Sequence, residues 1–172
     1  MNYNQTLLLR IFIPFIISYD LIKYVIVNST NYSSFILLKL IENNTFLIDG
    51  FIIFKETYVK LITACAAPSA YFLLLLLIVF TKDMKLIKGI KIFFFGSLIL
   101  FVFNLVRIIS LVLILDKYSF AAFNALHLVL WTFLSSLLVA LIWIYFTKHY
   151  KIHSIPVYSD LKKLIKLIKK TH

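Results

Sequence analysis

The chain has few of the residues that give soluble proteins their charge and their cross-links. Its 172 residues include seven acidic side chains, one cysteine, three glycines and three prolines, and only 15% are charged. A single cysteine excludes an internal disulfide and the Cys-x-x-Cys pair that a membrane thiol oxidoreductase needs. One cysteine and four scattered histidines match no spacing of metal ligands. We therefore expect no metal and no cofactor.

Apolar residues are abundant instead. They make up 62% of the chain, and the mean hydropathy is +0.98. Several apolar runs approach the roughly 17–25 residues needed to cross a bilayer. We predict an all-α polytopic membrane protein, with one domain over residues 1–152 and a tail over 153–172. Four transmembrane helices are expected, at about residues 7–27, 64–80, 92–115 and 124–147.

The first apolar run is expected to be a retained span and not a cleaved signal peptide. It carries Arg10, Asp20 and Lys23, and no small-x-small cleavage site follows it.

The positions of the lysines predict the orientation in the membrane. The net charge is +11, and most lysines lie in two short clusters, one after the second span and one after the fourth. The connection after the third span holds only Lys117, opposed by Asp116. By the positive-inside rule both termini are cytoplasmic in a multi-pass protein of the cell membrane, and residues 28–63 lie outside. Clusters beside spans favour anionic lipids as partners and not nucleic acid.

Two segments outside the spans have patterns of their own. Asp49-Gly50 lies between two apolar runs, which predicts a hairpin, and residues 35–41 suit a short interfacial helix or strand. A small extracytoplasmic cap before the second span is therefore expected, although a plain loop fits the same residues. The tail 153–172 alternates apolar residues with lysines at helical spacing, which predicts a basic amphipathic helix on the cytoplasmic leaflet.

Three chemically active side chains are expected at similar depth in the outer leaflet. Cys65 begins the second span, Arg107 lies inside the third, and His127 lies in the first turn of the fourth. An arginine inside a span costs about 2.5–3.5 kcal/mol, so it faces the bundle interior or water and marks a functional site by default.

This combination suits covalent catalysis. Cys65 would be the nucleophile, Arg107 would stabilise a thiolate or an oxyanion, and His127 would carry the proton to a leaving amine. Supporting roles are expected for Asn104 beside the guanidinium, Ser69 in the same pocket and Asn124 one turn before His127. Pro68 favours the first turn of a helix with Ala67 as its N-cap, which would put Cys65 just beyond a helix N-terminus.

Each residue also has a plain structural explanation. A lone membrane cysteine is often packing or an acylation site, and a histidine at the end of a span is often interfacial. A non-catalytic four-span adaptor or small-solute carrier, with Arg107 as a buried anion or counter-ion site, therefore remains an alternative. A serine intramembrane protease fits less well, because no Gly-x-Ser sequence is present.

Cys65-Ala-Ala-Pro-Ser, then Asn104-Leu-Val-Arg107-Ile, then His127 in the next span resemble the core of the exosortase/archaeosortase family. The resemblance covers about residues 45–145. Many members have glycine where this chain has Ala67, Pro68 also departs from the motif, and many members have more spans.

The resemblance implies a cysteine transpeptidase or protease with Cys65, Arg107 and His127 in its active site. Its substrates would be exported proteins that end in a short motif, one membrane helix and a basic tail. Cleavage between motif and helix would form a thioacyl-enzyme, and a lipid, a glycan or water would then release the product.

Overall fold

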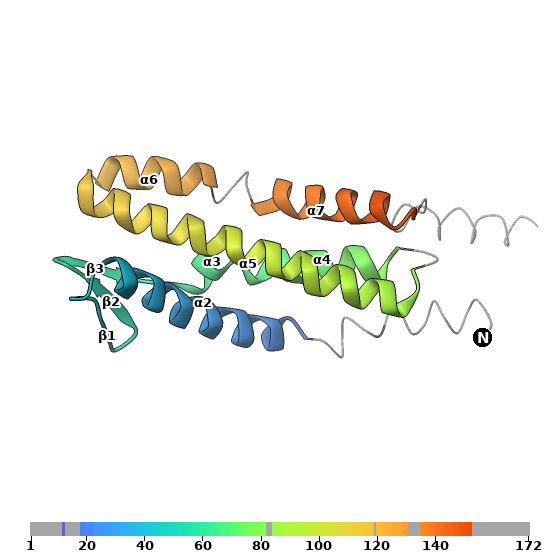
Figure 1. Cartoon of the computed structure of the whole chain (residues 1–172), viewed down its shortest axis with the longest axis horizontal. Coiled ribbons are helices and arrows are strands. Elements are labelled where there is room, and N and C mark those ends of the chain that lie inside the picture. The colour runs from blue at the N-terminus through green and yellow to red at the C-terminus, as the bar shows by residue number, and fades with distance from the viewer. Residues whose placement is uncertain (1–11, 13–17, 82–83, 119, 131–134, 153–172) are drawn as a thin grey trace, which may run out of the picture.

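The structure is a computed structural model that describes residues 12, 18–81, 84–118, 120–130 and 135–152. It is mainly helical, as predicted. The helices are α2 (Tyr19–Ile41), α3 (Thr63–Ala66), α4 (Pro68–Val79), α5 (Leu86–Lys117), α6 (Phe120–Val129) and α7 (Ser135–His149). Three strands, β1 (Phe46–Ile48), β2 (Phe51–Phe54) and β3 (Thr57–Lys60), form a sheet at one end of the elongated bundle (Figure 1). The predicted tail helix at 153–172 lies outside the described residues.

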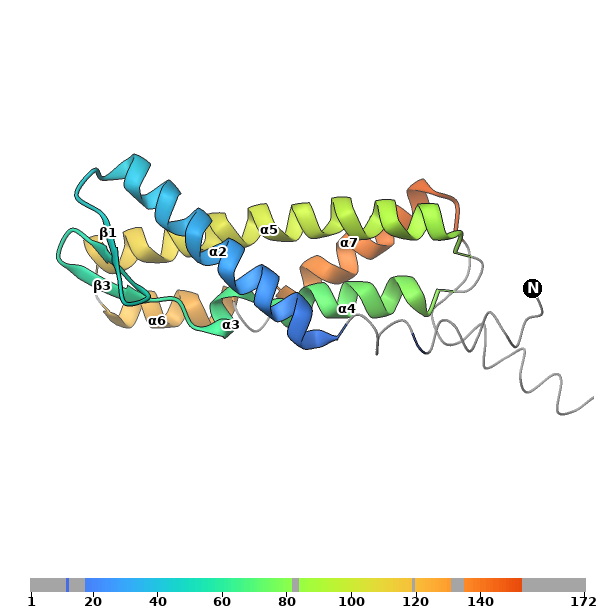
Figure 2. The same cartoon turned by 90° about the horizontal axis from the view of Figure 1, so that it is seen from below.

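Helix α5 is the axis of the bundle. It has 32 residues and packs against α2, α4, α6 and α7 (Figure 2). Within the described part of the chain it is the one helix long and apolar enough to cross a membrane, while α4, α6 and α7 are apolar but shorter. The expected third span, 92–115, lies within it.

The first helix differs from its predicted position. Helix α2 begins after Ser18, whose side chain accepts a hydrogen bond from the Leu21 N–H, and it continues to Ile41. The predicted end of this helix near residue 27 is therefore wrong, because the helix continues through residue 28 and the residues expected to form a separate segment. The polar residues after Val27 do not form a loop, because Thr30 and Ser34 are fully buried on the face of α2 that packs on the bundle. Residues 7–11 and 13–17 of the expected span lie outside the described chain.

The predicted hairpin is confirmed. Strands β1 and β2 are antiparallel, and Asp49 and Gly50 form the two-residue turn with φ of 51° and 78°, the left-handed values that an Asp-Gly turn adopts. Strand β3 was not expected from the sequence; it pairs with β2, and a second two-residue turn joins the two strands.

Apolar packing fixes this sheet to the helices. Ile52 and Phe54 are buried in a cluster with Leu38 of α2 and with Ile108 and Val112 of α5.

An ion pair adds a second link between the sheet and α5. The Lys55 ammonium lies 2.6 Å from the Asp116 carboxylate, and this hydrogen bond raises the pKa of Lys55.

The second and fourth predicted spans are each divided. The chain at 63–79 forms the single turn α3 and then α4, because Ala67 between them is left-handed. The expected helix at 124–147 is replaced by α6, which packs on α5, and α7, which packs on α4 and α5. This division lets the chain cover α5 over both halves of its length.

Side chains of α4 and α7 pack closely against α5 at Gly96. A Cβ atom there would lie 2.8 Å from Leu74 and 3.1 Å from Ile142, both buried in the main apolar cluster. A larger side chain at this position must displace the buried side chains of Leu74 and Ile142.

We expect Gly96→Leu to lower the free energy of unfolding by about 1–3 kcal/mol, the usual effect of overpacking. Thermal unfolding in detergent measures it. Val102→Leu also adds bulk to α5, but at a position that is 51% exposed, and should leave the stability unchanged. Equal stabilities for the two variants would contradict the packing described here.

Candidate functional site

Cys65 lies in a tight turn that connects the sheet to α4. Strand β3 leads through Leu61 and Ile62 into α3, where the Cys65 N–H donates to the Ile62 carbonyl at 2.8 Å. Ala67 then caps α4 and Pro68 is its first residue, as the sequence predicted. Cys65 does not continue the axis of α4, because the left-handed Ala67 turns the chain. The thiol is free and half-buried.

Arg107 joins α5 to this turn. Its Nη2 donates a hydrogen bond of 2.7 Å to the backbone carbonyl of Cys65, and the residue is only 8% exposed. A buried charge needs such a partner, because leaving it unpaired in an apolar interior is costly. The contact therefore places the backbone of the turn that carries Cys65 beside the guanidinium.

His127 approaches the same place from α6. The charge of Arg107 acts electrostatically on Cys65 and on His127. The expected position of His127 in a first turn is wrong: α6 begins at Phe120 and ends at Val129, so His127 is in its last turn. Its half-buried ring meets the ring of Phe123 edge to face, with 5.5 Å between centroids.

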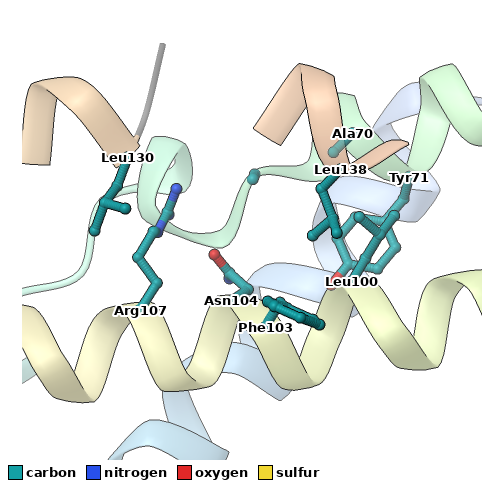
Figure 3. Close-up of a pocket in the computed structure, with 9 residues that line it drawn as sticks. Ala70, Tyr71, Leu100, Phe103, Asn104, Arg107, Leu130 and Leu138 are labelled. Atoms are coloured by element: carbon teal, nitrogen blue, oxygen red, sulfur yellow. The ribbon is translucent and has the colours of Figure 1, made fainter. Parts of the chain in front are cut away.

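A pocket opens beside Arg107, between α4, α5 and the end of α6. Its cavity has a volume of about 30 Å³. Figure 3 shows Arg107 and Asn104 pointing from α5 toward the chain between α3 and α4, with Leu130 beside the guanidinium. The residues that line the pocket are Ala67, Ala70, Tyr71, Leu100, Phe103, Asn104, Arg107, Leu130 and Leu138.

The three supporting residues lie in different places. Asn104 lines the pocket one turn before Arg107. Ser69 does not share that pocket, because α4 turns it outward; it is exposed on a separate groove with Phe72 and Leu73. Asn124 is exposed on α6.

Tyr71 was not identified from the sequence. It is 1% exposed, it lines the pocket, and the charge of Arg107 acts on it as well. The one signal available was a phenol at the start of an otherwise apolar run, one turn after Ala67.

Comparisons with known proteins add no relative. No family model matches the chain, and no curated protein or solved structure matches it either.

Ala67 adopts φ 50° and ψ 48°, a left-handed conformation that costs a residue with a Cβ roughly 1–2 kcal/mol. We expect Ala67→Gly to raise the free energy of unfolding by up to about 1 kcal/mol, since glycine adopts this conformation without that penalty. Ala70→Gly, inside α4, should lower it by about 1 kcal/mol. Chemical unfolding in detergent distinguishes the two, and the same sign for both would contradict the conformation at Ala67.

Proposed function

We propose that this protein is a membrane-embedded cysteine transpeptidase or protease of the exosortase/archaeosortase type, acting on the sorting signals of exported proteins. The observation that carries the proposal is the hydrogen bond from Arg107 to the Cys65 carbonyl, which joins two distant sequence motifs in one site.

The surface of the bundle supports a membrane location. Four large apolar residues of α5 recur at a spacing of four and are each at least 50% exposed: Phe94, Leu98, Val102 and Val106. A continuous apolar stripe of this kind is unfavourable in water and suits lipid. The proposal has four membrane passes. In chain order they are a first pass that overlaps the start of α2, a second formed by α3 and α4, a third formed by α5, and a fourth formed by α6 and α7.

The charges support one orientation. Lysines gather at the end of the bundle where α5 begins and α7 ends, and Lys88 Nζ lies 3.4 Å from the Tyr150 carbonyl across these two helices. The described lysines at this end are Lys85, Lys88, Lys91, Lys148 and Lys151. At the opposite end the sheet carries acidic residues as well as lysines. The lysine-rich end would be cytoplasmic, and the sheet and the site would face outward.

The proposed reaction uses the three side chains in sequence. The Cys65 sulfur attacks the scissile carbonyl carbon, its proton passes to His127, and Arg107 stabilises the oxyanion. The C–N bond then breaks, His127 returns the proton to the leaving amine, and a thioacyl-enzyme remains. An amine, a hydroxyl or water attacks this thioester and regenerates the thiol.

A second candidate is a non-catalytic adaptor or small-solute carrier. It is favoured by the mainly apolar pocket that contains Arg107, which suits a small anion as well as a reaction site. If the chain is an adaptor or a carrier, Arg107 stabilises the α3 turn, and the Cys65 sulfur takes no part in the function.

Orientation can be measured with single cysteines in a Cys65→Ala background. We expect a membrane-impermeant maleimide to label Glu56→Cys, in the second hairpin turn, on intact cells. Lys148→Cys, at the lysine-rich end, should react only after lysis. The reverse pattern would place the site on the cytoplasmic side and end the proposal.

The thioacyl-enzyme can be trapped directly. We expect membranes that contain the original protein and a candidate substrate to carry a polypeptide adduct on Cys65, which neutral hydroxylamine releases and intact-protein mass spectrometry identifies. His127→Ala should lower the amount of this adduct, because neither the thiol proton nor the leaving amine then has its proton carrier. Cys65→Ala should show no adduct.

A fatty-acyl adduct alone, or normal substrate processing by Cys65→Ala, would contradict the enzyme. Either result would favour the adaptor.

A further inference from the structure

Two hydrogen-bond donors in the Arg107 pocket have no partner. The Tyr71 hydroxyl and the Asn104 side-chain nitrogen are buried, and neither bonds to any group in the described part of the chain. Tyr71 is 1% exposed and Asn104 is 8% exposed. Buried polar groups are nearly always hydrogen-bonded in folded proteins, so two unpaired donors lining one pocket need partners from outside the described chain, either ordered water or a bound ligand.

The composition of the pocket restricts that ligand. Most of the lining is apolar, and it includes no acidic side chain. The polar groups are the Tyr71 phenol, the Asn104 amide and the guanidinium of Arg107, and the two atoms without a partner, the phenol hydroxyl and the amide nitrogen, can donate hydrogen bonds. A ligand that presents oxygen acceptors is therefore favoured, and a cation is not. The cavity is small, about 30 Å³, which is room for one or two oxygen atoms and not for a bulky ligand.

The position of the pocket indicates the source of those acceptors. Arg107 lines it and also donates to the backbone carbonyl of Cys65, so the pocket begins beside the turn that carries Cys65. From there it extends along α5 toward Leu100, away from the sheet (Figure 3). In the proposed orientation this direction leads into the membrane.

A polypeptide that enters the bilayer as a helix must be unwound where it is cut, and its carbonyl groups then lose their partners in an apolar medium. We propose that this pocket binds main-chain carbonyl oxygens of the substrate just beyond the scissile bond, on its membrane side, with Tyr71 and Asn104 as donors. This inference rests on the proposed function and identifies how that site recognises an extended peptide.

The test compares two alkylating reagents with the same reactive group. Bromoacetamide probes the thiol alone. Bromoacetyl-dialanine methylamide places two peptide units on the side of the reacting carbon where the leaving segment would lie. Rates of Cys65 modification are measured by intact-protein mass spectrometry on the full chain in detergent, and the ratio of the two rates removes the intrinsic reactivity of the thiol.

We expect Tyr71→Phe and Asn104→Leu each to lower this rate ratio by about five- to tenfold, the effect of one lost hydrogen bond. Tyr71→Phe keeps the ring and removes only an unpaired hydroxyl, so its melting temperature should equal or exceed that of the original protein. Trp143→Phe is the matched control, because its indole nitrogen is also buried and without a partner in the described residues but lies outside this pocket. Its ratio should not change.

An unchanged ratio in both pocket variants would overturn the subsite while leaving the enzyme proposal intact. A Cys65 that reacts with neither reagent would count against the enzyme. In that case the pocket is tested by measuring whether acetyl-dialanine methylamide raises the melting temperature. This increase must be lost in Tyr71→Phe. Stabilisation by diheptanoyl phosphatidylcholine in place of the peptide would show that lipid carbonyls occupy the pocket, and would also overturn the inference.

Discussion

The burial of the Arg107 guanidinium is the constraint on which the site depends. An arginine in an apolar bundle needs an oxygen partner, and here the partner is the backbone carbonyl of Cys65. To present that carbonyl, the chain between β3 and α4 forms a single helical turn and reverses through a left-handed Ala67. The position of the turn that carries Cys65 thus follows from the need to satisfy a charge on another helix.

The rest of the fold holds this contact from both sides. Toward the C-terminal end of α5, the sheet is fixed by the packing of Ile52 and Phe54 against Ile108 and Val112, which lie close to Arg107 on the same helix. Toward the other end, Gly96 lets α4 and α7 approach α5 closely. Cys65 lies between these two packed regions, so the turn that carries it is connected at each end to a rigid element.

In the pocket beside Arg107, the apolar side chains contribute to stability and two of the polar side chains do not. Its apolar lining packs the helices, but the Tyr71 hydroxyl and the Asn104 amide nitrogen are left without partners in the described chain. Unpaired buried donors destabilise a protein, and they persist where a ligand can pair them. A peptide whose carbonyls have lost their helical partners is complementary to such a lining.

The sequence by itself determined those parts of the fold that depend on residues close together in the chain. Apolar runs predicted helices, Asp49-Gly50 predicted a hairpin because its turn needs left-handed residues, and Pro68 marked the first residue of α4. The Asn104–Arg107 spacing placed both side chains on one face of α5, where both line the pocket. Each of these depends on neighbours within a few residues.

Other features depended on contacts between segments, and only the tertiary structure decided them. Thr30 and Ser34 look like loop residues in the sequence, but the bundle buries them and α2 continues to Ile41. The direction of Ser69 away from the pocket follows from the turn at Ala67, and the role of Tyr71 follows from what α4 packs against. A sequence specifies which side chains are available, but whether a polar group is buried, and beside what, is determined by residues far along the chain.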